Sequence, residues 1–418
     1  MTNKNSIHRA LSEHSVSSRT LQDAALKLLS HCESRRWAGV DPYDALNSRI
    51  FQALPILDRR IPRLILTQAL KRNIFNFRPL LMVPGAQNPK ALGLFLMSLV
   101  KLSKLGLVHG TDSVAEMVNT LESRRSSDSK YWCWGYSFPW QTRTLLVPRW
   151  APNLVCTTFI ANALLDAYER TGESRLLEMA SSGARFILNE LYWTEGDSVA
   201  GFAYPLPSMR NNVHNGNLLG AALFCRVARH TGEKIFIEPA LRVARYSASR
   251  QHDDGSWNYG EAPNQGWIDN FHTGYNLDAL RTIGNALETD EFEGRVRQGF
   301  EFYRAHFFRE DGAARYFHDR TYPIDIHCVA QSIITLVNFK GLDPGNMQLA
   351  HSVLNWAMNH MWDEKGYFYY RVLRTCTIRT SYMRWSQAWM LLAMSTLLSE
   401  SRAEGKPVTV EDTTAAVQ

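Results

Sequence analysis

The sequence predicts an all-α protein in which six helical hairpins close into a ring. A polar residue opens a strongly apolar helical stretch five times, at intervals of 55 to 65 residues, and an amphipathic stretch follows each one. A repeat of this length marks a supersecondary unit that buries its apolar face against its neighbours. The opening residues are Asn88, Asn153, His214, His272 and His327, with Arg384 in a sixth equivalent position. Ring closure would bring the starts of all six inner helices, and their polar side chains, to one rim.

Each hairpin has its own start and stop signals. The first inner helix begins at Pro89, where the missing N–H of proline is harmless, and its partner spans 112–125. The second begins after Asn153, ends at Thr171-Gly172 and returns over 174–190. The later pairs span 218–228 with 237–249, 277–287 with 293–306, and 328–339 with 347–360. Inner stretches are apolar nearly all round and outer ones are amphipathic, as two concentric layers require.

The sixth inner helix, 385–398, has no outer partner after it in the chain. We therefore expect an N-terminal helix, either 21–32 or 50–72, to close the ring. Residues 21–400 would then form a single domain, since no linker rich in Pro, Gly or Ser separates the repeats. A flexible N-terminus is expected over 1–20 and a disordered polar tail over 401–418.

Composition restricts the classes of function. The net charge of +6 is spread along the chain without a concentrated basic stripe, which argues against nucleic-acid binding. Six cysteines lie far apart without CxxC spacing, so buried free thiols are expected rather than a zinc site. Without a signal peptide or a membrane-spanning segment, the protein is expected to be cytoplasmic. The sequence calls for no cofactor and leaves the oligomeric state open.

Aromatic loops follow the outer helices. They include 131–140, 201–204, 253–260, 314–317 and 366–370, and the only expected extended stretches lie in such loops. Aromatic faces stack on the C–H faces of sugar rings while their polar edges stay hydrated. The alternative is that these rings cap the helix layers. Among the loop side chains, those expected to bind a substrate are Trp140, Trp257, Tyr259 and Trp267, together with the helix-start amides Asn217 and Asn276.

The segment 266–277 concentrates polar side chains at a helix start. Asp269, His272, Tyr275 and Asn276 lie within eight positions, and His272 and Tyr275 share a helical face. Histidine transfers protons near neutral pH, and a tyrosine beside a cation can do the same. The alternative is a capping aspartate with a packed histidine. His214 and His327 in equivalent positions favour a catalytic rim. A zinc site is the other interpretation of three histidines, but no HxH or HExxH spacing supports it.

Charged side chains supply two further roles. Arg384 and Arg149 could hold a carboxylate in a bidentate fork. Asp254, Glu261, Asp269 and Asp325 are the carboxylates that could serve as general acid or base. An inverting hydrolase would need two of them roughly 6.5–9.5 Å apart across the sugar.

The repeat and its aromatic loops resemble the (α/α)6 toroid enzymes, the six-hairpin glycosidase-like proteins, over residues 85 to 400. Pro148-Arg149-Trp150-Ala151, Asp254-Gly255-Ser256 with Tyr259, and Phe271-His272-Thr273 are similar to the catalytic domain of D-glucuronyl C-5 epimerases. The chain lacks the β-rich N-terminal portion of those epimerases. Residues 251–257 also resemble the QW motif of terpenoid cyclases, but once only and without a DxDD motif.

These observations lead to one hypothesis and two alternatives. The first is an enzyme of bacterial polysaccharide metabolism that removes a proton at C-5 of a uronate in an oligo- or polysaccharide, by epimerisation or β-elimination. His272 would act as base, Tyr275 or Tyr136 as acid, and Arg384 or Arg149 would stabilise the developing negative charge. The alternatives are an inverting glycoside hydrolase that uses Asp254 with Asp269 or Asp325, and a non-catalytic glycan-binding protein on the same fold.

Overall fold

Six apolar helices form a closed ring at the centre of the computed structural model, which describes residues 18–108 and 112–404. In order around the ring, and back to the first, they are α5 (Pro89–Lys104), α7 (Leu154–Thr171), α9 (His214–Thr231), α11 (Asn270–Leu287), α13 (Ile326–Asn338) and α15 (Trp389–Glu404). Each helix contacts the next one, and α15 contacts α5. This closure confirms the predicted all-α toroid.

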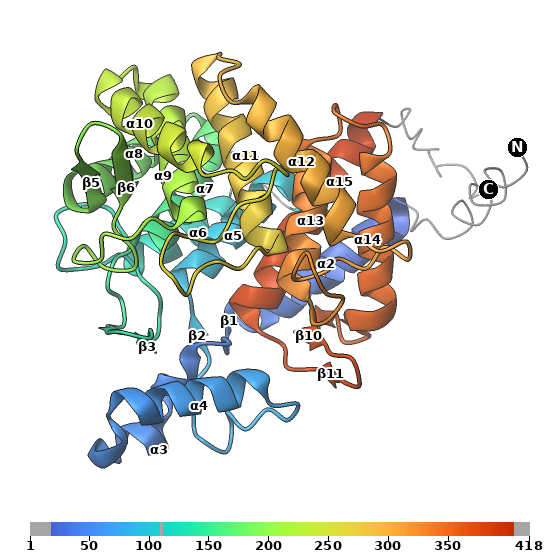
Figure 1. The fold of residues 1–418 in the computed structure, drawn as a ribbon. Coiled ribbons are helices and arrows are strands. Elements are labelled where there is room, and N and C mark those ends of the chain that lie inside the picture. The colour runs from blue at the N-terminus through green and yellow to red at the C-terminus, as the bar shows by residue number, and fades with distance from the viewer. Residues whose placement is uncertain (1–17, 109–111, 405–418) are drawn as a thin grey trace, which may run out of the picture.

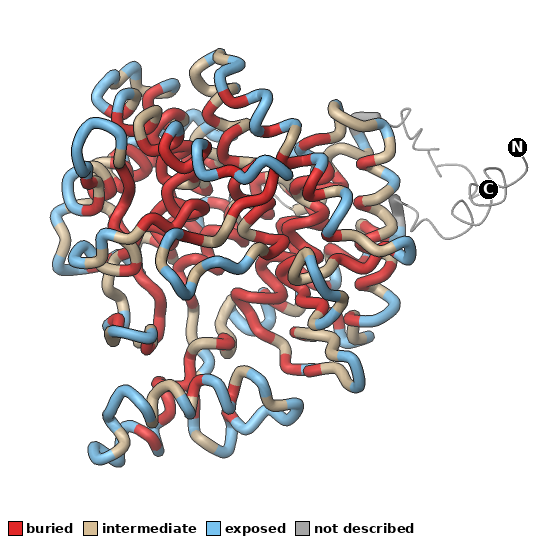
Figure 2. The backbone as a smooth tube through the Cα atoms, in the orientation of Figure 1, coloured by how far each residue is buried: buried red, intermediate tan, exposed pale blue. Residues whose placement is uncertain are grey.

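A second helix packs outside each inner one (Figure 1). The outer helices are α6 (Asp112–Ser123), α8 (Ser174–Phe186), α10 (Ile237–Ser249), α12 (Glu293–Phe307), α14 (Asn346–Met361) and α2 (Ser18–Ser34). α2 packs on α15, so the helix predicted over 21–32 is the one that closes the ring. Most residues of the inner helices are buried (Figure 2), which explains why those stretches are apolar all round.

Capping residues explain where the inner helices begin. The side chains of Asn88 and Asn153 accept backbone N–H bonds from the first turns of α5 and α7. In α11 and α13 the caps are Asp269 and Asp325, which accept from the N–H groups of His272 and His327. The predicted histidine openers are therefore first-turn residues. Aspartates cap the helices of His272 and His327, whereas Val213, which precedes His214, provides no side-chain cap.

The remaining elements are short. Within the described residues, the strands form small antiparallel sheets: β1 (Ala38–Gly39) with β2 (Ala86–Gln87), β3 (Trp140–Gln141) with β4 (Leu146–Val147), β5 (Tyr192–Glu195) with β6 (Val199–Phe202), β8 (Trp362–Asp363) with β9 (Tyr367–Phe368), and β7 (Ile324–Asp325), β10 (Arg371–Val372) and β11 (Thr377–Ile378) in the order β11-β10-β7. Short helical turns are η1 (Asp44–Asn47), η2 (Pro55–Leu57), η3 (Ile187–Leu191), η4 (Lys234–Phe236) and η5 (Met383–Ala388). η5 is a π-helical turn that carries Arg384.

Residues 41–84 form a lobe at one end of the ring, below it in Figure 1. The stretch predicted as one helix over 50–72 contains α3 (Arg49–Gln52), η2 and α4 (Arg60–Arg72). The lobe has a small core of its own, built from Ala45, Leu70 and Val83. Buried Arg78 ties it to the ring, donating to Asp44 at 2.7 Å and to the Tyr382 hydroxyl at 2.9 Å.

The six cysteines are free thiols, and five of them are buried, as their apolar surroundings in the sequence predict. Across residues 18–108 and 112–404, no helix combines the length and the apolar character needed to cross a bilayer. The predicted flexible N-terminus overlaps the described chain only at residues 18–20, and of the predicted tail only 401–404 are described.

Candidate active site

A cavity of about 300 Å³ opens where the inner helices begin. Most of its wall is aromatic, and the polar side chains that reach it come from several hairpins and from the lobe. The lining residues are Tyr43, Lys90, Tyr136, Phe138, Trp140, Val155, Tyr204, Asn215, Tyr259, Trp267, Phe271, His272, Tyr275, Tyr316, Phe317, Arg384 and Trp385. A concave apolar site with a few convergent polar groups is typical of ligand binding. Of the predicted site residues, seven lie here: Tyr136, Trp140, Tyr259, Trp267, His272, Tyr275 and Arg384.

His272 is held by the aspartate that caps its helix. Its Nδ1 lies 2.7 Å from Oδ2 of Asp269, and its backbone N–H donates to Oδ1 of the same side chain. The indole N–H of Trp267 also donates to Asp269, at 2.9 Å. Asp269 is completely shielded, whereas the His272 side chain is 20% exposed. With Nδ1 bonded to the carboxylate, Nε2 is the nitrogen that a bound molecule can reach, and a carboxylate behind an imidazole favours a proton on Nδ1.

Tyr275 lies on the same helix face and is backed by another histidine. Its hydroxyl is 2.6 Å from Nε2 of His327, which is buried behind the cavity wall. Burial raises the pKa of Tyr275 well above its ordinary value, although Arg384 opposes the shift. Burial also lowers the pKa of His327, and Lys90 and Arg384 lower it further. At neutral pH the pair is therefore a protonated phenol beside a neutral imidazole.

Arg384 is fixed from behind by a carboxylate from the start of the lobe. Its Nε and one terminal nitrogen donate to the two oxygens of Asp41 at 2.6 and 2.8 Å. Burial alone would lower the pKa of Arg384, but the Asp41 carboxylate outweighs it and raises the pKa. The second terminal nitrogen makes no hydrogen bond to a described residue, so it remains available to an anionic ligand.

Lys90 is a lining residue that the sequence analysis did not single out. It lies in the first turn of α5, and its Nζ is 4.0 Å from the Phe159 ring centroid and 5.9 Å from that of Tyr275. Burial lowers the pKa of Lys90 well below its ordinary value, and the charge of Arg384 adds to the effect. A lysine interrupting an apolar inner helix was the available signal. Perturbed titratable groups in a cavity are typical of functional sites.

Carboxylates are absent from the lining, as far as residues 18–108 and 112–404 are concerned. Asp254 is exposed and accepts from the backbone N–H and hydroxyl of Ser256. Asp325 is buried and bonded to Arg371 and to the indole of Trp385. The Asp269 carboxylate is already bonded to His272 and to the indole N–H of Trp267. The same part of the chain also contains no cluster of His, Cys, Asp or Glu that could hold a metal ion.

Five other predicted site residues lie outside the cavity. His214 is buried beside a separate hollow, and burial lowers its pKa to about 4. Trp257 packs in the core, where its indole N–H donates to the Ser247 carbonyl. The side-chain oxygen of Asn217 accepts a hydrogen bond from the backbone N–H of Phe202. Asn276 is also buried, and Arg149 is exposed with a 2.7 Å bond to Asn47.

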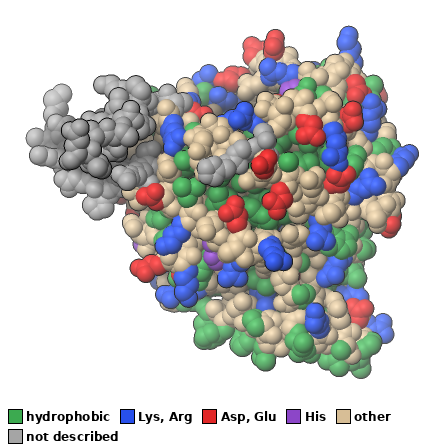
Figure 3. Space-filling model, turned by 180° about the vertical axis from the view of Figure 1, so that it is seen from behind, with side chains coloured by type: hydrophobic (Ala, Val, Ile, Leu, Met, Phe, Trp, Pro, Cys, Tyr) green, Lys and Arg blue, Asp and Glu red, His purple; other side chains and the backbone are tan. Residues whose placement is uncertain are grey.

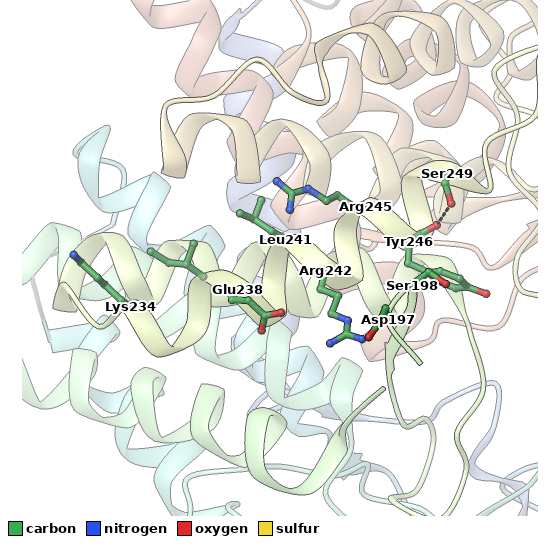
Figure 4. Close-up of a pocket in the computed structure, with 10 residues that line it drawn as sticks. Asp197, Ser198, Lys234, Glu238, Leu241, Arg242, Arg245, Tyr246 and Ser249 are labelled. Atoms are coloured by element: carbon green, nitrogen blue, oxygen red, sulfur yellow. Dashed lines mark hydrogen bonds between the residues drawn. The ribbon is translucent and has the colours of Figure 1, made fainter. Parts of the chain in front are cut away.

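A wider hollow of about 700 Å³ lies on the outer side of the ring, along α10 (Figure 4). Two of its charged side chains have partners: Arg245 pairs with Glu291, and Arg242 donates to the Gly196 carbonyl. Tyr246 is the one aromatic side chain among the described residues that line this hollow, whereas most of the wall of the central cavity is aromatic.

Tyr43, Tyr204 and Tyr316 line the cavity, although no sequence pattern distinguishes them from the other tyrosines. Tyr43 comes from the lobe, and the repeated hairpin pattern of the sequence does not include that segment. Tyr204 and Tyr316 lie in two of the predicted aromatic loops, and only their depth in the structure separates them from their neighbours.

The sequence matches no protein-family model and no curated protein. Solved structures are similar. A polysaccharide lyase matches with a TM-score of 0.58 at 10% identity, over 94% of this chain and 100% of that one. A possible member of the GH105 family from Salmonella enterica gives 0.57 at 11% identity, over 94% and 96%. The cellobiose 2-epimerase of Spirochaeta thermophila gives 0.55 at 14% identity, over 76% and 89%. At these identities the likeness establishes the fold alone: the chain is an (α/α)6 toroid of helical hairpins.

Proposed function

We propose that the protein is a carbohydrate-active enzyme that removes the proton at C-5 of a uronate residue in a glycan. One observation carries the proposal: the ionisable side chains of the cavity are His, Tyr, Lys and Arg, and no described carboxylate lines it. A glycosidase acting through an acid and a base needs two carboxylates facing the sugar. Proton abstraction beside a carboxylate needs a base, a proton donor and a cation, and this cavity offers all three.

The base is His272. Its Nδ1 contact with Asp269 leaves Nε2 to accept the proton, and the carboxylate stabilises the imidazolium that forms. Removing the C-5 proton places negative charge on the sugar carboxylate, where the free terminal nitrogen of Arg384 stabilises it. Lys90, whose pKa burial lowers, is a second group able to take part in proton transfer.

The donor is Tyr275, whose raised pKa keeps it in the protonated form that a donor must have. Delivery of its proton to the opposite face of C-5 yields the epimer, with His327 hydrogen-bonded to the phenolate that remains. The phenolate regains a proton, and His272 gives up the one it took, by exchange with solvent when the product leaves. Loss of the C-4 substituent before reprotonation yields instead an unsaturated uronate. The twelve aromatic side chains of the lining suit stacking on the neighbouring sugar rings.

The polysaccharide lyase and the cellobiose 2-epimerase among the similar structures are, by their names, carbohydrate-active proteins, and this supports the substrate class. The test is incubation of the protein with uronate-containing and neutral glycans in deuterated water, followed by NMR. We expect deuterium at C-5 or unsaturated ends. New reducing ends without either signal would point to hydrolysis, and no change in any glycan would point to a binding protein.

A further inference from the structure

The lobe exposes large apolar side chains over a short stretch of chain. Ten of the thirteen exposed large hydrophobic residues of the described chain lie between residues 50 and 82. The most exposed are Ile56 at 82%, Leu80 at 72% and Ile61 at 68%. Figure 3 shows hydrophobic side chains gathered at the bottom of the molecule, where α3 and α4 lie. Contiguous exposed apolar surface of this kind marks an interaction site.

The same lobe is strongly basic. Over residues 41–84 the chain has seven basic residues and three acidic ones, Asp41, Asp44 and Asp58, a net of +4. Buried Asp41 and Asp44 pair with the buried Arg384 and Arg78, so they do not neutralise the exposed arginines. Asp58 pairs with Arg63. The exposed Arg49, Arg59, Arg60 and Arg72 make no ion pair with any described side chain. The exposed surface therefore combines apolar side chains with uncompensated positive charge.

Helix α4 shows how the two kinds of side chain are arranged. Ile61 and Ile65 lie one turn apart on its outer face, and Arg60 and Arg72 are exposed on the same helix. Its opposite face packs Thr67 and Leu70 against the lobe. An amphipathic helix with apolar side chains flanked by arginines is typical of helices that lie in the interfacial region of a bilayer.

We propose that the lobe docks on an anionic membrane surface. Arginines near such a surface are attracted by the acidic headgroups, while the isoleucine, leucine and phenylalanine side chains enter the boundary with the acyl chains. A second copy of the chain fits less well, because a two-fold interface would bring these arginines against themselves. The cores of protein interfaces are also depleted of charge.

The docked lobe would hold the cavity close to the membrane. Arg63 of α4 donates to Gln141 in β3 at 3.2 Å, and the ring of Tyr43, which lines the cavity, lies 5.7 Å from that of Trp385 in η5, measured between centroids. With the buried Arg78, these contacts fix the lobe beside the cavity entrance. The docking proposal does not depend on which reaction the cavity performs.

The test uses the full chain in co-sedimentation with vesicles of phosphatidylcholine, with and without phosphatidylglycerol. We expect binding to the anionic vesicles that weakens with added salt. Ile61→Glu with Ile65→Glu should reduce the affinity at least about tenfold. Arg59→Gln, Arg60→Gln and Arg72→Gln together should reduce it roughly a hundredfold, at roughly fivefold for each arginine. Ile235→Glu, an exposed isoleucine outside the lobe, is the matched control and should bind normally.

The proposal would be overturned if the protein sedimented equally well without vesicles, or if all the variants bound the vesicles as the wild type does. Light scattering on the same samples separates the main alternative. Concentration-dependent dimers that vanish in the Ile61→Glu, Ile65→Glu variant, with no vesicle binding by the wild type, would identify a second copy as the partner instead. Because every substituted side chain is exposed, far-UV circular dichroism should be unchanged in each variant.

Discussion

The hydroxyl of Tyr275 lies 2.6 Å from Nε2 of His327, and only the tyrosine of this pair lines the cavity. The pair joins two adjacent inner helices, α11 and α13, near their N-terminal ends. His327 is stacked against Trp389 and Phe271 and is shielded from solvent. The Tyr275 hydroxyl therefore has a hydrogen-bond partner that a ligand in the cavity cannot displace. His272 and His327 occupy equivalent positions in the repeat, but only His272 lines the cavity.

Tyr275→Phe should suppress epimer formation but not deuterium exchange at C-5. The ring stays packed, but the proton donor is lost, so His272 can still remove the C-5 proton and return solvent deuterium to the same face. We expect C-5 exchange to persist while epimer formation falls by roughly 10²-fold or more. The NMR assay in deuterated water reads both signals. Tyr303→Phe is the control, because it also loses a buried hydroxyl bond, to Asn270, outside the cavity. Equal loss of exchange and inversion in Tyr275→Phe would contradict the donor role.

His272→Asn should abolish both signals. Removal of a general base typically lowers turnover by roughly 10²–10⁴-fold. His230→Asn serves as the control, because His230 pairs with Glu169 at the far end of α9. Unchanged turnover in His272→Asn would remove His272 from the mechanism and leave Lys90 as the base to examine.

Arg384→Gln should destabilise the protein as well as weaken uronate binding. It leaves Asp41 buried without its partner, and breaking a buried pair on one side costs about 3–5 kcal/mol. Combining it with Asp41→Asn should recover a large part of the free energy of unfolding while binding stays weak. Urea denaturation and ligand titration measure the two effects. Arg149→Gln, at an exposed site, should change neither; a loss of stability there comparable to that in Arg384→Gln would argue against the assignment.

Lys90→Met should change how stability depends on pH. Because burial lowers the folded-state pKa of Lys90, the unfolded chain binds one more proton between that pKa and 10.5. Stability of the wild type should therefore rise with pH in this window, by at most about 1.4 kcal/mol per pH unit. We expect urea denaturation at pH 7 and 8.5 to give a larger increase for the wild type than for Lys90→Met. Parallel behaviour of the two proteins would mean that Lys90 keeps its proton when folded.

Gly135→Ala should disrupt the loop that presents Tyr136. A Cβ at Gly135 would lie 2.1 Å from the carbonyl oxygen of Ala151, so one of the two backbone segments must move. We expect a lower melting temperature and reduced turnover. Gly294→Ala, in the first turn of α12 with open space around it, should instead stabilise the protein by roughly 0.5–1 kcal/mol. A Gly135→Ala variant with wild-type melting would contradict the close approach.

The ring could be predicted because its signals repeat along the sequence. Capping residues such as Asn153 and stops such as Gly172, which has a φ of 73°, act locally, and the alternation of apolar and amphipathic helices follows from the two layers. The cavity was harder to predict, since it depends on which rim side chains turn inward. His214 and His272 occupy equivalent places in their repeats, yet only His272 lines the cavity.

The positions of residues outside the repeat could not be predicted from the sequence. Asp41 holds Arg384 from 343 positions away along the chain, and no local pattern couples the two. The lobe has helical stretches without a repeat partner, so the prediction for 50–72 could give its helical character but not its position beside the rim. Lys90 could have been noticed in the sequence as a charged residue in an apolar inner helix. Its place in the cavity wall, beside aromatic rings, is known only from the structure.

Because α2 packs on α15, the ring joins helices from opposite ends of the described chain. During synthesis, five inner helices and their neighbours can assemble hairpin by hairpin as they leave the ribosome, but the groove that receives α2 is incomplete until residues 389–404 have emerged. The nascent protein must therefore keep the apolar face of α2 soluble until α15 has emerged, and Arg384, which precedes α15, meets Asp41 only at that stage. The site is thus completed by the same helix that closes the ring.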